Sequence, residues 1–359
     1  YNNFGYFGIY VSTIILFIAL SFVIYYVNLK LTKNEFFSII LSIICVFQLS
    51  MFAVARAQII SLICFVLEFY WINRVIMTGE KKYCFYLFLV CILLANVHAT
   101  VWPFFFILFL PFFAEHLISL FGKTHFKLPY EFKLKIETIP HIKTLLSTFL
   151  ISLFLGILSP SRICYTYIFK IMMGDSQKFL LEHLPLTVIE HPFFIISILV
   201  LLIILIFTET KIYLRELFMI GGITFMCLTS TRHLSFFYTI VVIEIGILGV
   251  RCLNAKNDRT FDILGKMLLE KNYLYCILIL FLVVFSCFRF LDHSKEEFVP
   301  KKDYPVGAVE YIKNNLDYKN LKIYNGYDYG SYLLFQDIPV FIDARCDLYL
   351  KEFNGMSYS

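Results

Sequence analysis

The sequence predicts an all-α polytopic membrane protein of about ten transmembrane or partly inserted helices, followed by a small, truncated α/β soluble domain. Three observations lead to this prediction. Of the 359 residues, 60% are hydrophobic and 16% are charged, and the mean hydropathy is +0.77, values that are far from those of soluble domains. The apolar residues gather in long runs, and the composition changes abruptly to charged and turn-rich sequence after Leu291.

Ten apolar runs are the candidate spans. They cover residues 7–27, 36–54, 59–72, 83–95, 101–121, 144–158, 193–207, 217–231, 234–250 and 273–291. Several are shorter than the roughly 20 residues that cross a bilayer at right angles. We expect these runs to extend into flanking polar residues or to enter the membrane only part-way.

The distribution of Lys and Arg predicts the orientation. If all ten runs cross, the connections on one side carry five basic residues, Arg56, Arg162, Lys170, Lys178 and Arg232, and those on the other side carry 17. The 17 are Lys30, Lys33, Arg74, Lys81, Lys82, Lys123, Lys127, Lys133, Lys135, Lys143, Lys211, Arg215, Arg251, Lys256, Arg259, Lys266 and Lys271. Because cytoplasmic connections are enriched in Lys and Arg, we assign the 17 to the cytoplasm. Both ends of the chain are then expected outside, in a bacterial plasma membrane, with one further span expected before Tyr1.

The predicted domain boundary follows residue 291. Residues 1–291 are expected to form the transmembrane helical domain, and residues 292–359 an incomplete extracytoplasmic α/β domain. Within the second segment, the patterns predict strands at 321–324 and 339–342 and helices at 305–314 and 331–335.

Several classes of site find no support. The net charge of +5 comes from scattered residues that form no basic stripe for nucleic acid. The 10 Cys stand alone, with no CxxC or Cys/His cluster, and no phosphate-cradling Gly-rich pattern or HExxH spacing occurs. The sequence therefore identifies no metal site. It leaves open a divalent cation as cofactor, and it does not determine the oligomeric state.

Polar residues stand at the extracytoplasmic ends of the predicted spans. They are Arg56, Gln58, Asn96, His98, Arg232 and His233. Ionisable groups at membrane depth often mark a substrate path, and Arg is well shaped to bind phosphate at two points. These residues are our candidate lipid-phosphate site. The alternative is that each one caps a helix end or reaches out to the lipid headgroups.

Two further sets of residues are candidates for binding an acceptor substrate. Glu182 and His183 lie in the long outer loop 159–192, where a solvated loop is the alternative interpretation. Asp343, Arg345 and Asp347 follow the predicted strand 339–342, and strand alternation directs all three to one face. A salt link within the set is the alternative there.

Five motifs, taken in order along the chain, carry a family resemblance. They are Arg56-Ala57-Gln58, Ala95-Asn96-Val97-His98, Ser159-Pro160-Ser161, Glu182-His183-Leu184-Pro185 and Phe341-Ile342-Asp343-Ala344-Arg345-Cys346-Asp347-Leu348-Tyr349. In this order the chain resembles the polytopic GT-C class of membrane glycosyltransferases, in particular bacterial members with an extracytoplasmic C-terminal domain. It departs from that pattern at Ala57, Ala99, His183 and Ala344.

The resemblance implies a function. Enzymes of this class take a sugar from a polyprenyl-phosphate donor on the outer face, with an acidic base in the first outer loop. That loop is expected upstream of Tyr1, so the catalytic residue is not assigned here. The expected partners are the membrane lipid and the polyprenyl-phosphate sugar donor. The rival interpretation is a non-enzymatic transporter or lipid-handling protein, which is expected to carry polar or broken segments at mid-membrane.

Overall fold

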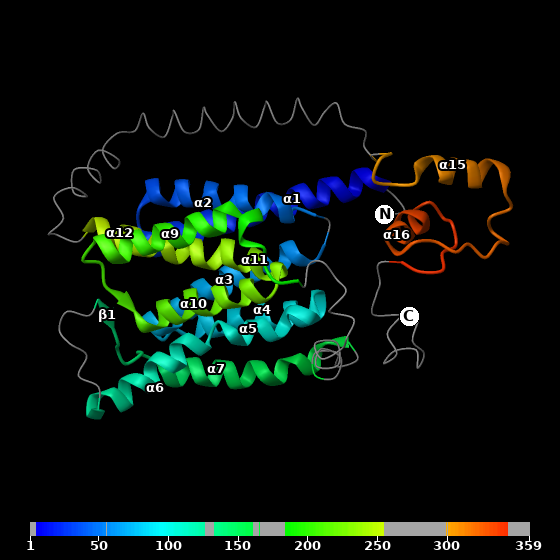
Figure 1. Ribbon diagram of the computed structural model, residues 1–359. Helices are drawn as coiled ribbons and strands as arrows, with labels where there is room; N and C mark the ends of the chain where they lie inside the picture. Colours follow the sequence, from blue (N-terminus) through cyan, green and yellow to red (C-terminus); the bar gives the residue numbers. More distant parts are fainter. Residues whose placement is uncertain are drawn as a thin grey trace. The chain divides into compact units, whose positions relative to one another are not determined.

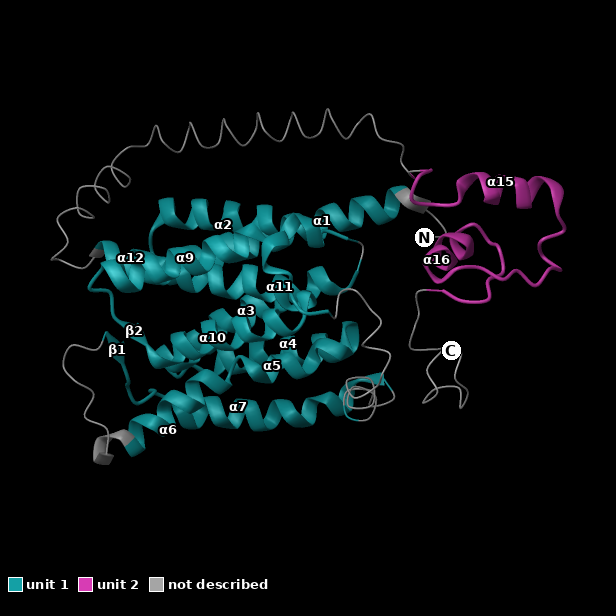
Figure 2. Cartoon of the chain, in the orientation of Figure 1, with its two compact units in different colours: residues 1–270 teal, residues 271–359 magenta. Residues whose placement is uncertain are grey.

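The computed structural model describes residues 5–54, 56–125, 133–160, 165, 184–254, 299 and 301–343. The chain divides into two compact units, residues 1–270 and residues 271–359 (Figure 2). The predicted domain boundary after residue 291 and the predicted span 273–291 both fall outside the described residues.

The first unit is a bundle of helices joined by short turns (Figure 1). Its helices are α1 (Gly5–Thr32), α2 (Glu35–Leu49), α3 (Gln58–Thr78), α4 (Lys81–Val97), α5 (Trp102–Ile107), α6 (Leu110–His125), α7 (Ile142–Leu155), α9 (Pro192–Phe207), α10 (Leu214–Thr229), α11 (Leu234–Phe236) and α12 (Val242–Asn254). Each apolar run that the sequence shows before residue 251 overlaps one of these helices or a consecutive pair. The helices extend past the shortest runs, into the flanking polar residues.

Five segments of the described chain are long and apolar enough to cross a membrane. They are Phe7–Thr32, Glu35–Phe52, Gln58–Thr78, Ala99–Phe121 and Thr231–Leu253. The apolar helices at Ile142–Leu158 and Pro192–Phe207 are shorter. The protein is therefore an integral membrane protein built of helices, while the ten predicted crossings are not confirmed.

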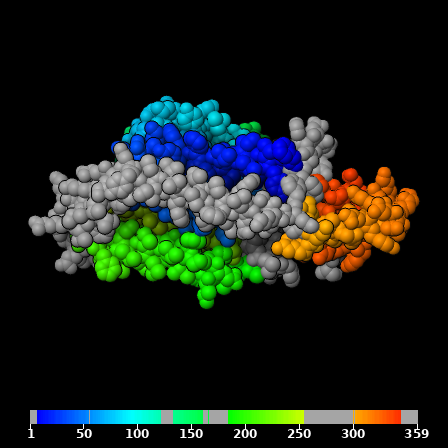
Figure 3. Space-filling model, turned by 90° about the horizontal axis from the view of Figure 1, so that it is seen from above, coloured from blue at the N-terminus to red at the C-terminus, as the bar shows by residue number. Residues whose placement is uncertain are grey.

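One face of α1 is exposed and does not pack against the other described helices of the bundle. Ile14, Ile18 and Phe22 follow one another at four-residue spacing and are 56%, 56% and 72% exposed. Residues at this spacing lie on one side of a helix, and an exposed stripe of large apolar side chains is the surface that hydrocarbon covers. Part of α1 is visible as the dark blue strip in Figure 3.

The turns between helices gather at two opposite ends of the bundle (Figure 1). At one end, here called the basic end, the short parallel strands β1 (Leu134–Lys135) and β2 (Ile212–Tyr213) pair. The turn at Gly79, whose φ of +67° only glycine adopts readily, faces the ring of His141 there. The other end, here called the His98 end, holds the turns before α3, after α4 and before α11. This division follows the alternation on which the predicted orientation depends.

Buried polar contacts hold α1 and α2 together within the bundle. Asn28 Nδ2 donates to Ser42 Oγ over 3.2 Å, and Thr32 Oγ1 lies 2.9 Å from Ser38 Oγ. All four side chains are buried. Hydrogen bonds between small polar side chains are a common means of helix association in membranes, where apolar burial supplies little drive.

The second unit contains α15 (Val306–Asn315) and α16 (Tyr327–Phe335), close to the two helices predicted there. Within residues 301–343, neither 321–324 nor 339–342 forms a strand, so the predicted α/β character is not confirmed. The side chain of Asn325 joins these two segments instead. Its Oδ1 accepts from the N–H of Phe341 over 2.9 Å, and its Nδ2 donates to the carbonyl of Ile342 over 2.7 Å. One amide side chain therefore supplies bonds that a strand ladder would otherwise provide.

Candidate functional site

Polar side chains from three separate segments meet at the His98 end. Gln58 Nε2, at the start of α3, donates to Ser235 Oγ of α11 over 3.2 Å. Ser61 Oγ, one turn further along α3, lies 2.8 Å from His98 Nδ1 at the end of α4. The charge of Arg232, in the short turn η8 (Thr231–His233), acts on His98. We call Gln58, Ser61, His98, Arg232 and Ser235 the polar cluster.

Local backbone structure places His98 in the polar cluster. Its own N–H still donates to the carbonyl of Leu94, as in a helix, but its φ of −147° ends α4 at this residue. The side chain therefore points away from the α4 axis at a point where the chain turns toward α5. On α3, Ser61 lies three residues after Gln58, and this spacing puts both side chains on one face.

The surroundings of His98 keep its imidazole neutral. Burial, and to a smaller extent the positive charge of Arg232, lower the pKa of His98 to about 4. At neutral pH roughly one molecule in a thousand carries the proton, because each pKa unit changes the ratio tenfold. The polar cluster therefore combines one guanidinium with a neutral imidazole and three neutral hydrogen-bonding side chains.

His233, next to Arg232 in the chain, makes contacts with the end of α10 and with α5. Its Nδ1 lies 2.9 Å from the carbonyl of Met226, so Nδ1 carries the proton and donates to the last turn of α10. Its ring lies 5.2 Å from the ring of Phe104. These contacts join the end of α10 to α5, which matches the helix-end interpretation of this residue. A π-helical turn, Phe237–Val241, follows soon after and is buried throughout.

The structure does not bring every candidate of the predicted lipid-phosphate site into the polar cluster. Asn96 is exposed, and its side-chain amide donates to the carbonyl of Ile92 on its own helix. Arg56 is exposed and lies two residues before α3, at the same end of the bundle as the cluster. Of the predicted residues, Gln58 contacts Ser235, His98 contacts Ser61, and the charge of Arg232 reaches His98.

Most of the predicted acceptor-binding residues, Glu182, His183, Arg345 and Asp347, lie outside the described residues. Asp343 is described and is 1% exposed. It follows Ile342 in the second unit, where the backbone of Gly330 approaches so closely that an added Cβ would lie 2.6 Å from Asp343 Cα. Asp343 is therefore part of the packed interior of that unit.

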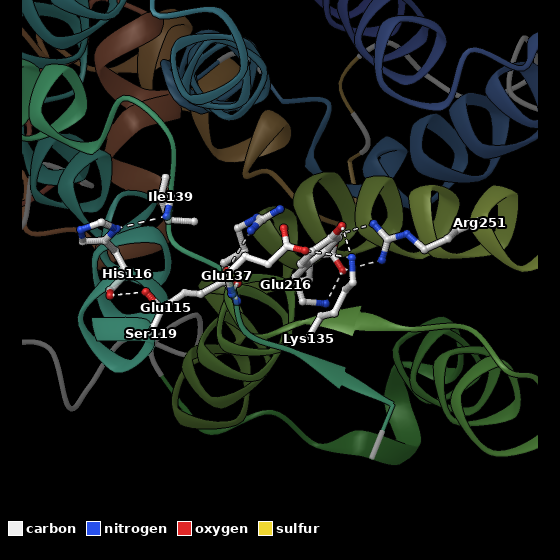
Figure 4. A network of polar contacts seen from close by, with 10 residues as sticks. Glu115, His116, Ser119, Lys135, Glu137, Ile139, Glu216 and Arg251 are labelled. Atoms are coloured by element: carbon white, nitrogen blue, oxygen red, sulfur yellow. Dashed lines mark hydrogen bonds and ion pairs between the residues drawn. The ribbon is translucent and has the colours of Figure 1, made fainter. Parts of the chain in front are cut away.

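A second polar network, absent from our sequence-based predictions, lies at the basic end (Figure 4). Glu115 of α6 is fully buried and accepts three hydrogen bonds. The donors are the N–H of Glu137 over 3.0 Å, the N–H of Arg215 over 3.1 Å and Arg215 Nη1 over 3.0 Å. One carboxylate thereby ties the loop after β1 and the start of α10 to α6.

The network continues through a second ion pair. Arg251 of α12 binds Glu216 of α10 at two points, over 2.9 Å and 2.7 Å. The ring of Tyr213 is within 4.1 to 5.1 Å of the charged groups of Lys135, Arg215 and Arg251, distances at which a cation is attracted to a ring face. Each of the three cations also has an acidic partner, so this network is charge-balanced and joins helices.

The sequence alone indicates only in part that Ser61 and Glu115 belong to these polar networks. Ser61 is detectable as a polar residue one turn from Gln58, but serine is common in membrane helices. Glu115 is a charge inside an apolar run, which was a usable signal. Its pairing with Arg215, 100 residues away, depends on the packing of α6 against α10, and no local pattern encodes that.

Two further acidic residues lie inside the spans. Glu68, in the middle of α3, is fully buried, and neither of its carboxylate oxygens has a hydrogen-bond partner among the described residues. Glu244 of α12 is also buried, with Oε2 unpartnered there.

The described residues hold no group of three or more His, Cys, Asp and Glu arranged to bind a metal ion. A comparison with known protein families finds none that matches the chain, and a comparison with curated proteins finds no similar sequence. The candidate site is therefore defined by its own geometry: a guanidinium, a neutral imidazole and amide and hydroxyl groups at one end of a membrane bundle.

Proposed function

We propose that the protein is a membrane glycosyltransferase that takes its sugar from a polyprenyl-phosphate donor on the extracytoplasmic face. The observation that carries the proposal is the convergence of Arg232, His98, Ser61 and Gln58 from distant parts of the chain at one end of the bundle. In this proposal the His98 end is the extracytoplasmic end. The five sequence motifs favour sugar transfer as the reaction, because they resemble those of GT-C enzymes.

The polar cluster has the chemistry that a lipid phosphate requires. A guanidinium binds phosphate oxygens at two points through charge-assisted hydrogen bonds. During sugar transfer, negative charge develops on the leaving phosphate, and a fixed cation beside it lowers the barrier. The apolar surface of the spans is where the polyprenyl chain would lie. The base that activates the acceptor is not assigned to any described residue.

Binding and turnover of a defined donor test the proposal. The protein is placed in lipid nanodiscs and given polyprenyl-phosphate-linked hexoses together with a cell-envelope extract as the source of acceptor hydroxyl groups, and release of polyprenyl phosphate is followed by mass spectrometry. Arg232→Gln is expected to weaken donor binding by about 10- to 100-fold, as for loss of a charged hydrogen bond, and Arg232→Lys by less. Lys81→Gln removes one positive charge at the opposite, basic end and is the matched control.

Unchanged binding in Arg232→Gln, or an equal loss in Lys81→Gln, would remove the polar cluster from the site. Binding without any release of sugar would instead favour the rival class, a transporter or lipid-handling protein. One observation speaks for that rival, namely Glu68, because an unpartnered acid in the middle of a span is typical of ion and proton paths. Movement of the intact donor across proteoliposomes would establish it.

A further inference from the structure

His98 and Ser61 form a pair that is able to accept a proton. Ser61 Oγ donates to the carbonyl of Ala57 over 3.1 Å and lies 2.8 Å from His98 Nδ1. Ser61 has a single proton, and we assign it to that carbonyl; in this arrangement the serine oxygen accepts the hydrogen on Nδ1. Nε2 then carries the lone pair, and no hydrogen bond of Nε2 occurs among the described residues. A proton added at Nε2 gives an imidazolium whose Nδ1–H is already bonded.

Among the described residues, few charged groups surround His98. Arg232 is the charged group whose field reaches it among the described residues. The elements packed against α4 are α3, α5, α7 and two short turns, Ala99–Val101 and Gly156–Leu158. Neither turn nor α5 carries an ionisable side chain, and on α7 Lys143 lies near the basic end. Arg56 precedes α3, and His233 is the last residue of η8, both at the His98 end.

A bound phosphate changes the balance of charge according to its ester state. Without ligand, burial and Arg232 keep the pKa of His98 low, at about 4. A phosphate diester carries one negative charge and merely offsets the guanidinium. A phosphate monoester carries close to two, so the net charge beside His98 becomes negative, and a negative neighbour favours the protonated imidazole.

We propose that His98 takes up a proton at Nε2 when a phosphate monoester binds beside Arg232, so that the site distinguishes monoesters from diesters by proton linkage. The proton comes from solvent, one N–H bond forms, and no bond to phosphorus is made or broken in this step. The inference rests on the proposed function. There the donor is a diester and the lipid product is a monoester, so His98 charges as the product forms and stabilises the leaving phosphate.

Matched ligands test this without knowledge of the sugar. Farnesyl phosphate and its methyl ester share one prenyl chain and differ by one negative charge. Their binding to the full chain in phosphatidylcholine nanodiscs is measured by calorimetry at pH 7.0 to 8.0, in buffers of different ionisation enthalpy, which reports the protons taken up. For farnesyl phosphate the dissociation constant is expected to decrease as the pH falls, by up to about tenfold per pH unit when one proton is taken up. For the methyl ester no change with pH is expected.

Two variants identify the proton acceptor. His98→Gln keeps a hydrogen-bonding group beside Ser61 but takes up no proton, so the pH dependence for the monoester is expected to disappear. If His98→Gln fails to fold, Ser61→Ala is used in its place. It removes the acceptor for Nδ1–H and is therefore expected to reduce proton uptake. His116→Gln is the control, because it removes a half-buried imidazole at the basic end whose Nδ1 accepts from the N–H of Ile139.

The outcomes separate the two proposals. Monoester binding with no proton uptake, or uptake that persists in His98→Gln, overturns the inference and leaves the lipid-phosphate site standing. Failure of both ligands to bind removes the proposed function and the inference together. Uptake in the wild type and in His116→Gln, but not in His98→Gln, is the result that we expect.

Discussion

Replacing Glu115 is expected to lower the stability of the protein more than replacing any other acid of the network at the basic end. Its carboxylate is fully buried and accepts from two backbone N–H groups and from Arg215 Nη1. Glu115→Ala leaves these three donors without an acceptor, and it leaves the Arg215 guanidinium, which is 18% exposed, without its partner. Removing one member of a buried ion pair costs about 3–5 kcal/mol.

The assay is thermal unfolding in detergent, followed by intrinsic fluorescence. For a domain of this size, each kcal/mol lowers the Tm by about 2–4 °C, so Glu115→Ala is expected to lower it by roughly 6–20 °C. Glu115→Gln retains one acceptor oxygen and is expected to lose about half as much. The matched control is Glu137→Gln at the same end, whose ion pair with Lys135 is solvent-exposed on both sides. Exposed pairs contribute about 0–1 kcal/mol.

Similar Tm values for Glu115→Ala and Glu137→Gln would refute the reasoning, because burial would then make no difference to the two acids. A double variant, Glu115→Gln with Arg215→Met, adds a second check. It removes both charges and is expected to be more stable than Glu115→Ala, since no uncompensated charge remains buried.

The remaining predictions concern Glu68 and Gly330. Glu68→Met is expected to raise the Tm, because it removes two buried oxygens without partners, each costing about 1–3 kcal/mol. Glu68→Gln, which stays polar, is the comparison, and a lower Tm in Glu68→Met would mean that the acid has a partner. Gly330→Ala is expected to destabilise the second unit by about 1–3 kcal/mol, since its Cβ would clash with the backbone carbonyl oxygen of Ile342. Gly307→Ala, whose Cβ meets nothing within 4 Å, is expected to be neutral or stabilising, and faster hydrogen exchange of α16 in Gly330→Ala alone would confirm the difference.

Within the second unit, helices were predicted more successfully than strands. The helix at 306–315 follows from its local pattern, whereas the apolar run Pro339-Val340-Phe341-Ile342 was expected to be a strand. A strand requires a neighbouring strand whose backbone N–H and C=O groups pair with its own. Here the side chain of Asn325 instead accepts from the N–H of Phe341 and donates to the carbonyl of Ile342. Sequence periodicity records which side chains are apolar, but it does not record which group satisfies the backbone.

The sequence by itself determined that this is a helical membrane protein. Its apolar runs, with 60% hydrophobic residues overall, are more than the core of a soluble domain of this length holds, and in lipid an α-helix satisfies every backbone group within its own segment. The sequence also placed Gln58, His98 and Arg232 at helix ends. Only the tertiary structure decided that Ser61 and Ser235 join them, that His98 is neutral beside Arg232, and that Glu115 pairs with Arg215. Hydropathy is a property of each segment alone, whereas hydrogen bonds, burial and pKa values depend on which segments pack together.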